Sequence, residues 1–187
     1  VIRIADSNIT ENKADGSGVG VYLIGPNTPV IFNCLLTGNT AGSDGGAISN
    51  NTFSALELSN CTIAYNNVTG IHCPSPYIPY GGGLSCLDKG NTNVINSILW
   101  SNSATFGPQI ALIQGPQGPA RATVDYSDVQ SGATGVFFDT SFSLIWNSHN
   151  LTGTSDVNPK FINGYRLKQT AAGQTEDSPC VNAGSNN

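Results

Sequence analysis

Hydrophobic positions along the chain recur with a fixed phase, in three short apolar stretches per repeat that are separated by turn residues. A small residue marks this phase, and we call it the marker; it occurs at Ser7, Cys34, Cys61, Ser97 and Ser127. Successive markers are 27, 27, 36 and 30 residues apart. An apolar β-former lies three positions before each marker and another lies two positions after it, without any segment of helical period. The pattern therefore predicts three short strands in each repeat.

Two further rows keep the same phase. Five residues after the marker the chain has Asn12, Asn39, Asn66, Asn102 and then Gly132. Other glycines recur at Gly18, Gly45, Gly81 and Gly107, each followed three residues later by Val21, Ile48, Leu84 or Ile110. In-phase asparagines predict a ladder in which each side-chain amide bonds to the next repeat. The glycines predict corners with positive φ, which other residues rarely adopt.

Self-similarity at this period is typical of a solenoid, in which each repeat buries its apolar side by stacking on its neighbours. We expect an all-β fold, a single-stranded parallel β-helix of about five coils whose strands stack roughly 4.8 Å apart. A β-sandwich is the alternative, but it predicts frequent hairpin turns and gives no reason for in-phase Asn and Gly rows. We assign the coils to residues 1–132, with a Pro-rich corner-loop insertion at 68–80, and an irregular capping segment to 133–187.

Composition narrows the possible partners. Only 10% of the 187 residues are charged, the net charge is −5 and no basic cluster occurs, so we expect neither nucleic acid nor an anionic membrane surface as a partner. The hydrophobic content of 39% argues against disorder. The sequence has no run that is long and apolar enough to span a membrane.

Several features favour an extracellular or cell-surface location. The chain has no methionine and begins within an expected strand at Val1, which indicates a processed piece or one domain of a longer protein. It has five cysteines and five Asn-x-Ser/Thr acceptors for N-glycosylation, at Asn8, Asn50, Asn60, Asn67 and Asn150.

The cysteines leave two interpretations open. Cys73 and Cys86 flank the insertion, where a disulfide would close its base. Cys34 and Cys61 hold the marker position in adjacent repeats, and they form either a disulfide or a pair of stacked free thiols. Cys180 is left over as a fifth thiol.

The later part of the chain resembles a known family. The segments in question are 96–102 (NSILWSN), 107–110 (GPQI), 124–130 (VDYSDVQ), 156–161 (DVNPKF), 165–167 (YRL) and 178–184 (SPCVNAG). In this order they resemble secreted right-handed parallel β-helix repeat proteins, including those with a choice-of-anchor Q region. Upstream Gly-Gly and Asn-Cys-Thr-Ile elements are similar to polymorphic-outer-membrane-protein repeats. The resemblance implies a right-handed β-helix at the cell surface, and it implies no activity.

We expect no catalytic residue, no metal ligand and no cofactor. Asp15 and Asp44 precede corner glycines, where Asp is usually a turn residue that bonds its own backbone. Asp125 and Asp128 flank a strand end as a pair of carboxylates, but no base or sugar platform accompanies them. His149 lies far from the only other histidine, and no Cys/His spacing matches a zinc site.

Aromatic residues offer a candidate ligand site. Tyr77 and Tyr80 lie in the Pro-rich loop, where they either stack on a glycan or pack against the wall of the helix. We assign them as the candidate glycan-binding residues.

The sequence favours a non-enzymatic structural or adhesive module of a larger cell-surface or filament-forming protein. The edge at Val1 requires a cover, either further β-helix coils or a neighbouring subunit that would build a homopolymer. The alternative functions are a carbohydrate-active enzyme, namely a polysaccharide lyase or hydrolase, and a glycan-binding module.

Overall fold

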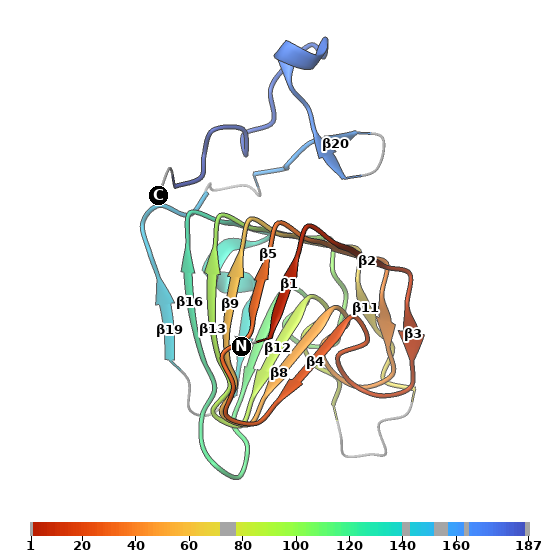
Figure 1. Cartoon of the computed structure of the whole chain (residues 1–187), viewed down its shortest axis with the longest axis vertical. Helices are drawn as coiled ribbons and strands as arrows, with labels where there is room; N and C mark the ends of the chain where they lie inside the picture. Colours follow the sequence, from red (N-terminus) through yellow and green to blue (C-terminus); the bar gives the residue numbers. More distant parts are fainter. Residues whose placement is uncertain (1, 72–77, 140–142, 152–156, 163–164, 186–187) are drawn as a thin grey trace.

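The computed structural model of the chain describes residues 2–71, 78–139, 143–151, 157–162 and 165–185. Within these ranges the protein is all-β, with short strands and two 3₁₀-helices, η1 (Gly132–Gly135) and η2 (Thr170–Ala172). Strands from successive repeats lie side by side in parallel sheets (Figure 1). Each of the five repeats therefore contributes one strand to each of three main sheets, as the sequence predicts.

Three sheets carry most of the structure. Sheet 1 has the strands before the markers: β1 (Arg3–Ala5), β5 (Val30–Phe32), β9 (Ala55–Ser59), β13 (Asn91–Ile95), β16 (Arg121–Asp125) and β19 (Ser143–Trp146). Sheet 2 has the strands after them: β2 (Asn8–Thr10), β6 (Leu35–Thr37), β10 (Thr62–Ala64), β14 (Ile98–Trp100) and β17 (Asp128–Val129). Sheet 3 follows the corner glycines: β4 (Val21–Ile24), β8 (Ile48–Asn51), β12 (Leu84–Leu87), β15 (Ile110–Ile113) and β18 (Val136–Phe138).

Two smaller sheets complete the set. One is parallel and lies between sheets 2 and 3 in the sequence: β3 (Lys13–Ala14), β7 (Thr40–Ala41) and β11 (Asn67–Val68). The other is an antiparallel pair in the C-terminal segment, β20 (Phe161–Ile162) and β21 (Arg166–Leu167). The strands β18 and β19 extend sheets 3 and 1, so the paired strands continue to Trp146 rather than stopping at residue 132.

The predicted apolar rows are confirmed by the strand register. In sheet 1, Ile4 pairs with Ile31, which pairs with Leu58, and the row continues through Val94 and Val124. Rows of the same kind run through sheet 2 and sheet 3. Because parallel pairing keeps every repeat in phase, one apolar position in the repeat becomes one continuous row of the core.

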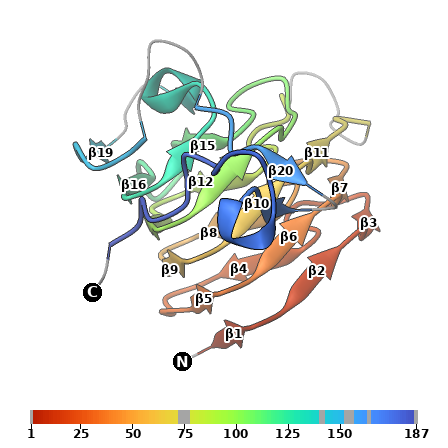
Figure 2. The ribbon, with the colours of Figure 1, turned by 90° about the horizontal axis from the view of Figure 1, so that it is seen from above.

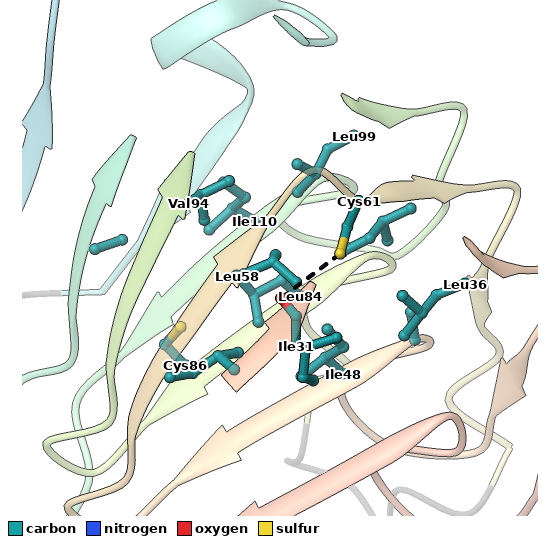
Figure 3. Close-up of a cluster of buried hydrophobic side chains, with 14 of the residues drawn as sticks. Ile31, Leu36, Ile48, Leu58, Cys61, Leu84, Cys86, Val94, Leu99 and Ile110 are labelled. Atoms are coloured by element: carbon teal, nitrogen blue, oxygen red, sulfur yellow. Dashed lines mark hydrogen bonds between the residues drawn. The ribbon is translucent and has the colours of Figure 1, made fainter. Parts of the chain in front are cut away.

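The rows face one another in the interior. Ile31 and Leu58 from sheet 1, Leu36 from sheet 2, and Ile48 and Leu84 from sheet 3 are at most 1% exposed and belong to one hydrophobic cluster (Figure 3). Full burial of such a side chain stabilises a fold by about 1.5–3 kcal/mol. Since most strands have only two to five residues, this packing, and not the individual strands, holds the structure together.

The Asn ladder is also confirmed. The Nδ2 atoms of Asn12, Asn39 and Asn66 each donate to the Oδ1 atom of the next asparagine, the last being Asn102, over 2.9 Å. The backbone N–H groups of the first three donate to the same Oδ1 atoms. The corner glycines have the expected positive φ, and at Gly45 a Cβ atom would lie 2.4 Å from the carbonyl oxygen of Ile48.

A second ladder runs through the markers. The hydroxyl oxygen of Ser97 accepts the N–H of Cys61, and that of Ser127 accepts the N–H of Ser97, each over 3.1 Å. The side-chain oxygen of Asn150 then accepts the N–H of Ser127 over 3.0 Å. The serine markers Ser97 and Ser127 are thus hydrogen-bond acceptors for the preceding repeat.

The cysteines of the described residues are free thiols and form no disulfide. Cys34 and Cys61 are both buried free thiols, so of the two alternatives the stacked thiols are correct. Cys86 is also a free thiol; its Sγ lies inside the fold, 3.0 Å from the hydroxyl oxygen of Thr92. The expected partner Cys73 lies outside the described residues.

Candidate ligand-binding groove

A groove runs between the outer side of sheet 2 and the C-terminal segment. Figures 1 and 2 show this segment, drawn in blue, leaving the sheets after β19 and returning over them with β20. Two cavities of about 400 Å³ each lie beneath it and share Asn60 and Thr62. We call the two cavities together the C-terminal groove; its further lining includes Asn8, Asn33, Leu35, Asn96, Ile98, Tyr126, Asp128, Leu151, Tyr165, Arg166, Leu167, Cys180 and residues 182–185.

The floor of the groove is built on a corner of left-handed backbone. The residues directly before the markers are Asp6, Asn33, Asn60, Asn96 and Tyr126, and their φ angles lie between 46° and 53°. Asn and Asp tolerate this conformation better than other non-glycine residues, because their short polar side chains bond locally. The turn into sheet 2 therefore selects asparagine in three successive repeats, and all three line the groove.

These asparagines differ in their partners. Asn33 donates its amide to the carboxylate of Asp6. The carboxamide of Asn96 bonds the main chain of Ser185 twice, because its Oδ1 accepts the N–H over 2.7 Å and its Nδ2 donates to the carbonyl over 3.3 Å. The exposed side chain of Asn60 lies between them, and among the described residues it has no hydrogen-bond partner.

The C-terminal wall is attached to the sheets by polar and aromatic contacts. Cys180 donates its thiol to Oδ2 of Asp128 over 3.1 Å, and Asp128 is only 2% exposed. Burial, together with the charge of Asp128, raises the pKa of the Cys180 thiol above its usual range, so the sulfur remains a donor. The rings of Tyr165 and Tyr65 lie 5.7 Å apart between their centroids and join the wall to the outside of sheet 2.

A polar cluster lies at the end of the corner row. Nδ1 of His149 lies 3.0 Å from Oδ1 of Asp125, Asn147 donates to Oδ2 over 3.0 Å, and the rings of His149 and Tyr126 stack with centroids 4.4 Å apart. Desolvation raises the pKa of Asp125, but the hydrogen bonds from His149, Asn147 and the Tyr126 N–H outweigh it and leave the pKa below its ordinary value. Asp125 and Asp128 thus bond different partners.

The other acids have structural roles. Asp44 is 4% exposed, accepts the N–H of Tyr80 and the hydroxyl of Ser43, and has its pKa raised by burial. In the described ranges no three His, Cys, Asp or Glu side chains gather as a metal site would require. The groove can therefore offer a ligand carboxamides, hydroxyls and a few aromatic rings.

The predicted aromatic site is altered by the structure. The ring of Tyr80 stacks on Phe137, with centroids 5.4 Å apart and an interplanar angle of 21°, and also lies 6.0 Å from Phe106. That stacked face is not available to a sugar, and glycan binding by Tyr80 stays a prediction. Tyr77 lies outside the described residues.

The five acceptors for N-glycosylation divide into two groups. Asn8 and Asn60 are exposed, and Asn67 is half-buried at the start of β11. Asn50 is completely buried, and Asn150 is 5% exposed. The amide nitrogens of these two donate to main-chain oxygens, so neither can carry a glycan in the folded protein, which corrects that part of the expectation.

The groove was missed at the sequence level, although a signal for it exists. The asparagine before the marker recurs as Asn33, Asn60 and Asn96 with the same phase as the ladder asparagines. Its outward direction follows from the left-handed turn, which the hydrophobic pattern does not reveal. The opposite wall comes from a segment without repeats, whose return over sheet 2 has no periodic signature.

A scan against known protein families found no matching family, and searches of curated proteins and of solved structures found no match either. No helix in the described part of the chain is long and apolar enough to cross a membrane. The strand pairing defines an all-β protein of stacked parallel sheets, and a polar groove lies on the outer side of these sheets.

Proposed function

We propose that the chain is a right-handed parallel β-helix of about five coils that serves as a non-enzymatic structural or adhesive module of an extracellular protein. Its first coil is covered, in this proposal, by a further β-helix coil or by a neighbouring subunit. The observation that carries this proposal is a difference between the two ends of the ladders.

At the last coil both ladders end in residues that do not occupy the recurring Asn or marker positions. Nδ2 of Asn102 donates to Oε1 of Gln109 over 2.7 Å, and Oε1 of Gln130 accepts from Gln109 and from the N–H of Ser101. Asn150 ends the marker ladder by accepting the N–H of Ser127. The side chains that end the two ladders are thus bonded within the chain.

The first coil is open by comparison. Both ends of the stack have edge strands, namely β1, β2, β3 and β4 at this end and β19, β17, β11 and β18 at the other, so the difference lies in the ladders and the apolar rows. Ile4 and Ile9 are only partly buried, whereas their register partners Ile31 and Leu36 are fully buried. Asn12 donates into the ladder, but among the described residues its own Oδ1 accepts no hydrogen bond.

The partner that fits this end is one more coil in the same phase. Such a coil would supply an asparagine amide to Oδ1 of Asn12, strands to the open edges and apolar side chains over Ile4 and Ile9. The interaction repeats the geometry that each coil already makes with the next.

Fusion of an additional coil tests the proposal. A copy of residues 28–54 placed directly before Val1 is expected to raise the melting temperature by about 5 °C, since roughly 1 kcal/mol shifts a domain of this size by 2–4 °C. A control fusion carries aspartate at the copied positions of Ile31, Leu36 and Ile48. Calorimetry should show the rise for the first fusion alone.

Equal melting temperatures for both fusions would contradict the role of the first coil. Light scattering on the unfused chain distinguishes a homopolymer from a cover by further coils of the same protein. Concentration-dependent filaments would show that identical copies cover the open end. Release of unsaturated or reducing ends from polysaccharides would favour the carbohydrate-active enzyme instead.

A further inference from the structure

We propose that the C-terminal groove binds a linear, uncharged oligosaccharide that lies along the stacking direction of the strands. The proposal rests on the groove and its floor, and it does not depend on what covers the first coil. It differs from the predicted Tyr77–Tyr80 site in both its location and its chemistry.

The floor has the spacing of a repeating ligand. Asn33, Asn60 and Asn96 occupy the same corner position in successive repeats, and strands of adjacent repeats lie roughly 4.8 Å apart. A linear glycan carries hydroxyl groups along its whole length, so some of them can reach the row wherever a carboxamide is exposed. An extended peptide rises about 3.3 Å per residue, and its equivalent side chains recur roughly every 6.6 Å, out of phase with the row.

The polarity of the floor suits hydroxyl groups. Carboxamides and the Thr62 hydroxyl both donate and accept, as sugar hydroxyls do, and they carry no charge. Of the charged lining residues, Arg166 belongs to one cavity only and Asp128 to the other, where Asp128 bonds Cys180. With a net charge of −5 for the chain, a polyanionic glycan is disfavoured.

Asn96 shows what a carboxamide in this row can do. It binds a donor and an acceptor of Ser185 at the same time. Asn60, one repeat away, presents the same pair of groups into both cavities without a partner among the described residues. Two neighbouring hydroxyls of one sugar would satisfy both groups.

Aromatic rings lie in both cavities. Tyr165 lines one cavity and Tyr126 lines the other. Tyrosine combines a broad apolar ring with a polar hydroxyl and so packs well against the mixed surface of a sugar. The groove therefore has one tyrosine in the lining of each cavity and the carboxamide of Asn60 on the shared floor.

Calorimetric titration with cellohexaose, mannohexaose and chitohexaose tests the proposal on the whole chain. We expect at least one of them to bind, and the Asn60→Gly variant to bind it at least tenfold more weakly. Glycine retains the positive φ of position 60, so the fold is preserved while the carboxamide is removed. Thr62→Val, which keeps the side-chain shape, should also weaken binding.

Glu11→Gly is the matched control, because Glu11 is exposed, has a φ of 58° and lies at a different corner. This variant should bind as the wild type does. The proposal is overturned if none of the neutral hexasaccharides binds, if Asn60→Gly binds unchanged, or if only oligogalacturonate or an extended peptide binds.

Discussion

At the scale of single residues, buried polar groups determine the phase of the repeats. Asn66 is fully buried, and its Nδ2 donates to the carbonyl oxygens of Leu36 and Ala64 and to Oδ1 of Asn102. Its Oδ1 accepts both the N–H and the amide of Asn39. A shift of register by one residue would leave these groups unpaired in the interior, so the ladder excludes alternative pairings as well as stabilising the observed one.

We therefore expect Asn66→Ala to lower the free energy of unfolding by about 3 kcal/mol, since it leaves the N–H and the side-chain amide of Asn39 without their acceptor. Asn12→Ala, at the open end, should lower the free energy of unfolding by less than about 1 kcal/mol, because water can replace the amide of Asn12 as a donor to Asn39. Urea denaturation of the two variants compares them directly. Similar losses at both positions would mean that burial of the ladder does not determine its contribution.

Asp44 gives the protein a stability that depends on pH. Burial raises its pKa in the folded state, so the folded protein holds this proton to higher pH than the unfolded chain does. Stability is therefore lost as the pH rises from about 4, the ordinary value for Asp, through the raised value. Denaturation between pH 3 and pH 7 should show the wild type losing stability relative to Asp44→Asn over this window. A constant difference across the range would contradict the raised pKa.

At the scale of elements, the hydrophobic pattern predicts the three main sheets because their strands have an inward residue in each repeat. The short strands β3, β7 and β11 were not predicted, since Lys13–Ala14, Thr40–Ala41 and Asn67–Val68 share no apolar alternation. Their pairing follows from the ladder beside them. The groove was beyond prediction for a related reason, because one wall is a segment without repeats.

The cysteines lie on these elements as buried thiols. Burial raises the pKa of Cys61 and Cys86 to about 12, and the thiolate is the form that reacts. At pH 8 we expect Cys34, Cys61 and Cys86 to resist a maleimide reagent in the native protein and to react fully in urea. Mass spectrometry of labelled peptides measures this. Labelling of native Cys86, or a Cys34–Cys61 disulfide in the intact protein, would contradict the structure.

At the scale of the whole molecule, the two ends and the outer side have separate tasks in our proposals. The side-chain ladders end within the chain at Gln130 and Asn150, while at the β1 end Oδ1 of Asn12 accepts no hydrogen bond from the described residues. The groove lies on the outer side of sheet 2 and uses residues that the core does not need. Changes in ligand chemistry can therefore occur on the floor of the groove without disturbing the inward rows.

The ladder distance has one more consequence. Asn39 and Asn66 are 27 residues apart, and Asn66 and Asn102 are 36 apart, yet both links measure 2.9 Å. The spacing of the ladder therefore does not depend on the number of residues in a repeat. The length of such a stack depends on the number of its repeats. Each added repeat lengthens it by one strand spacing, about 4.8 Å, whatever is inserted at its side. The length of the stack and the chemistry of its surface can then evolve independently.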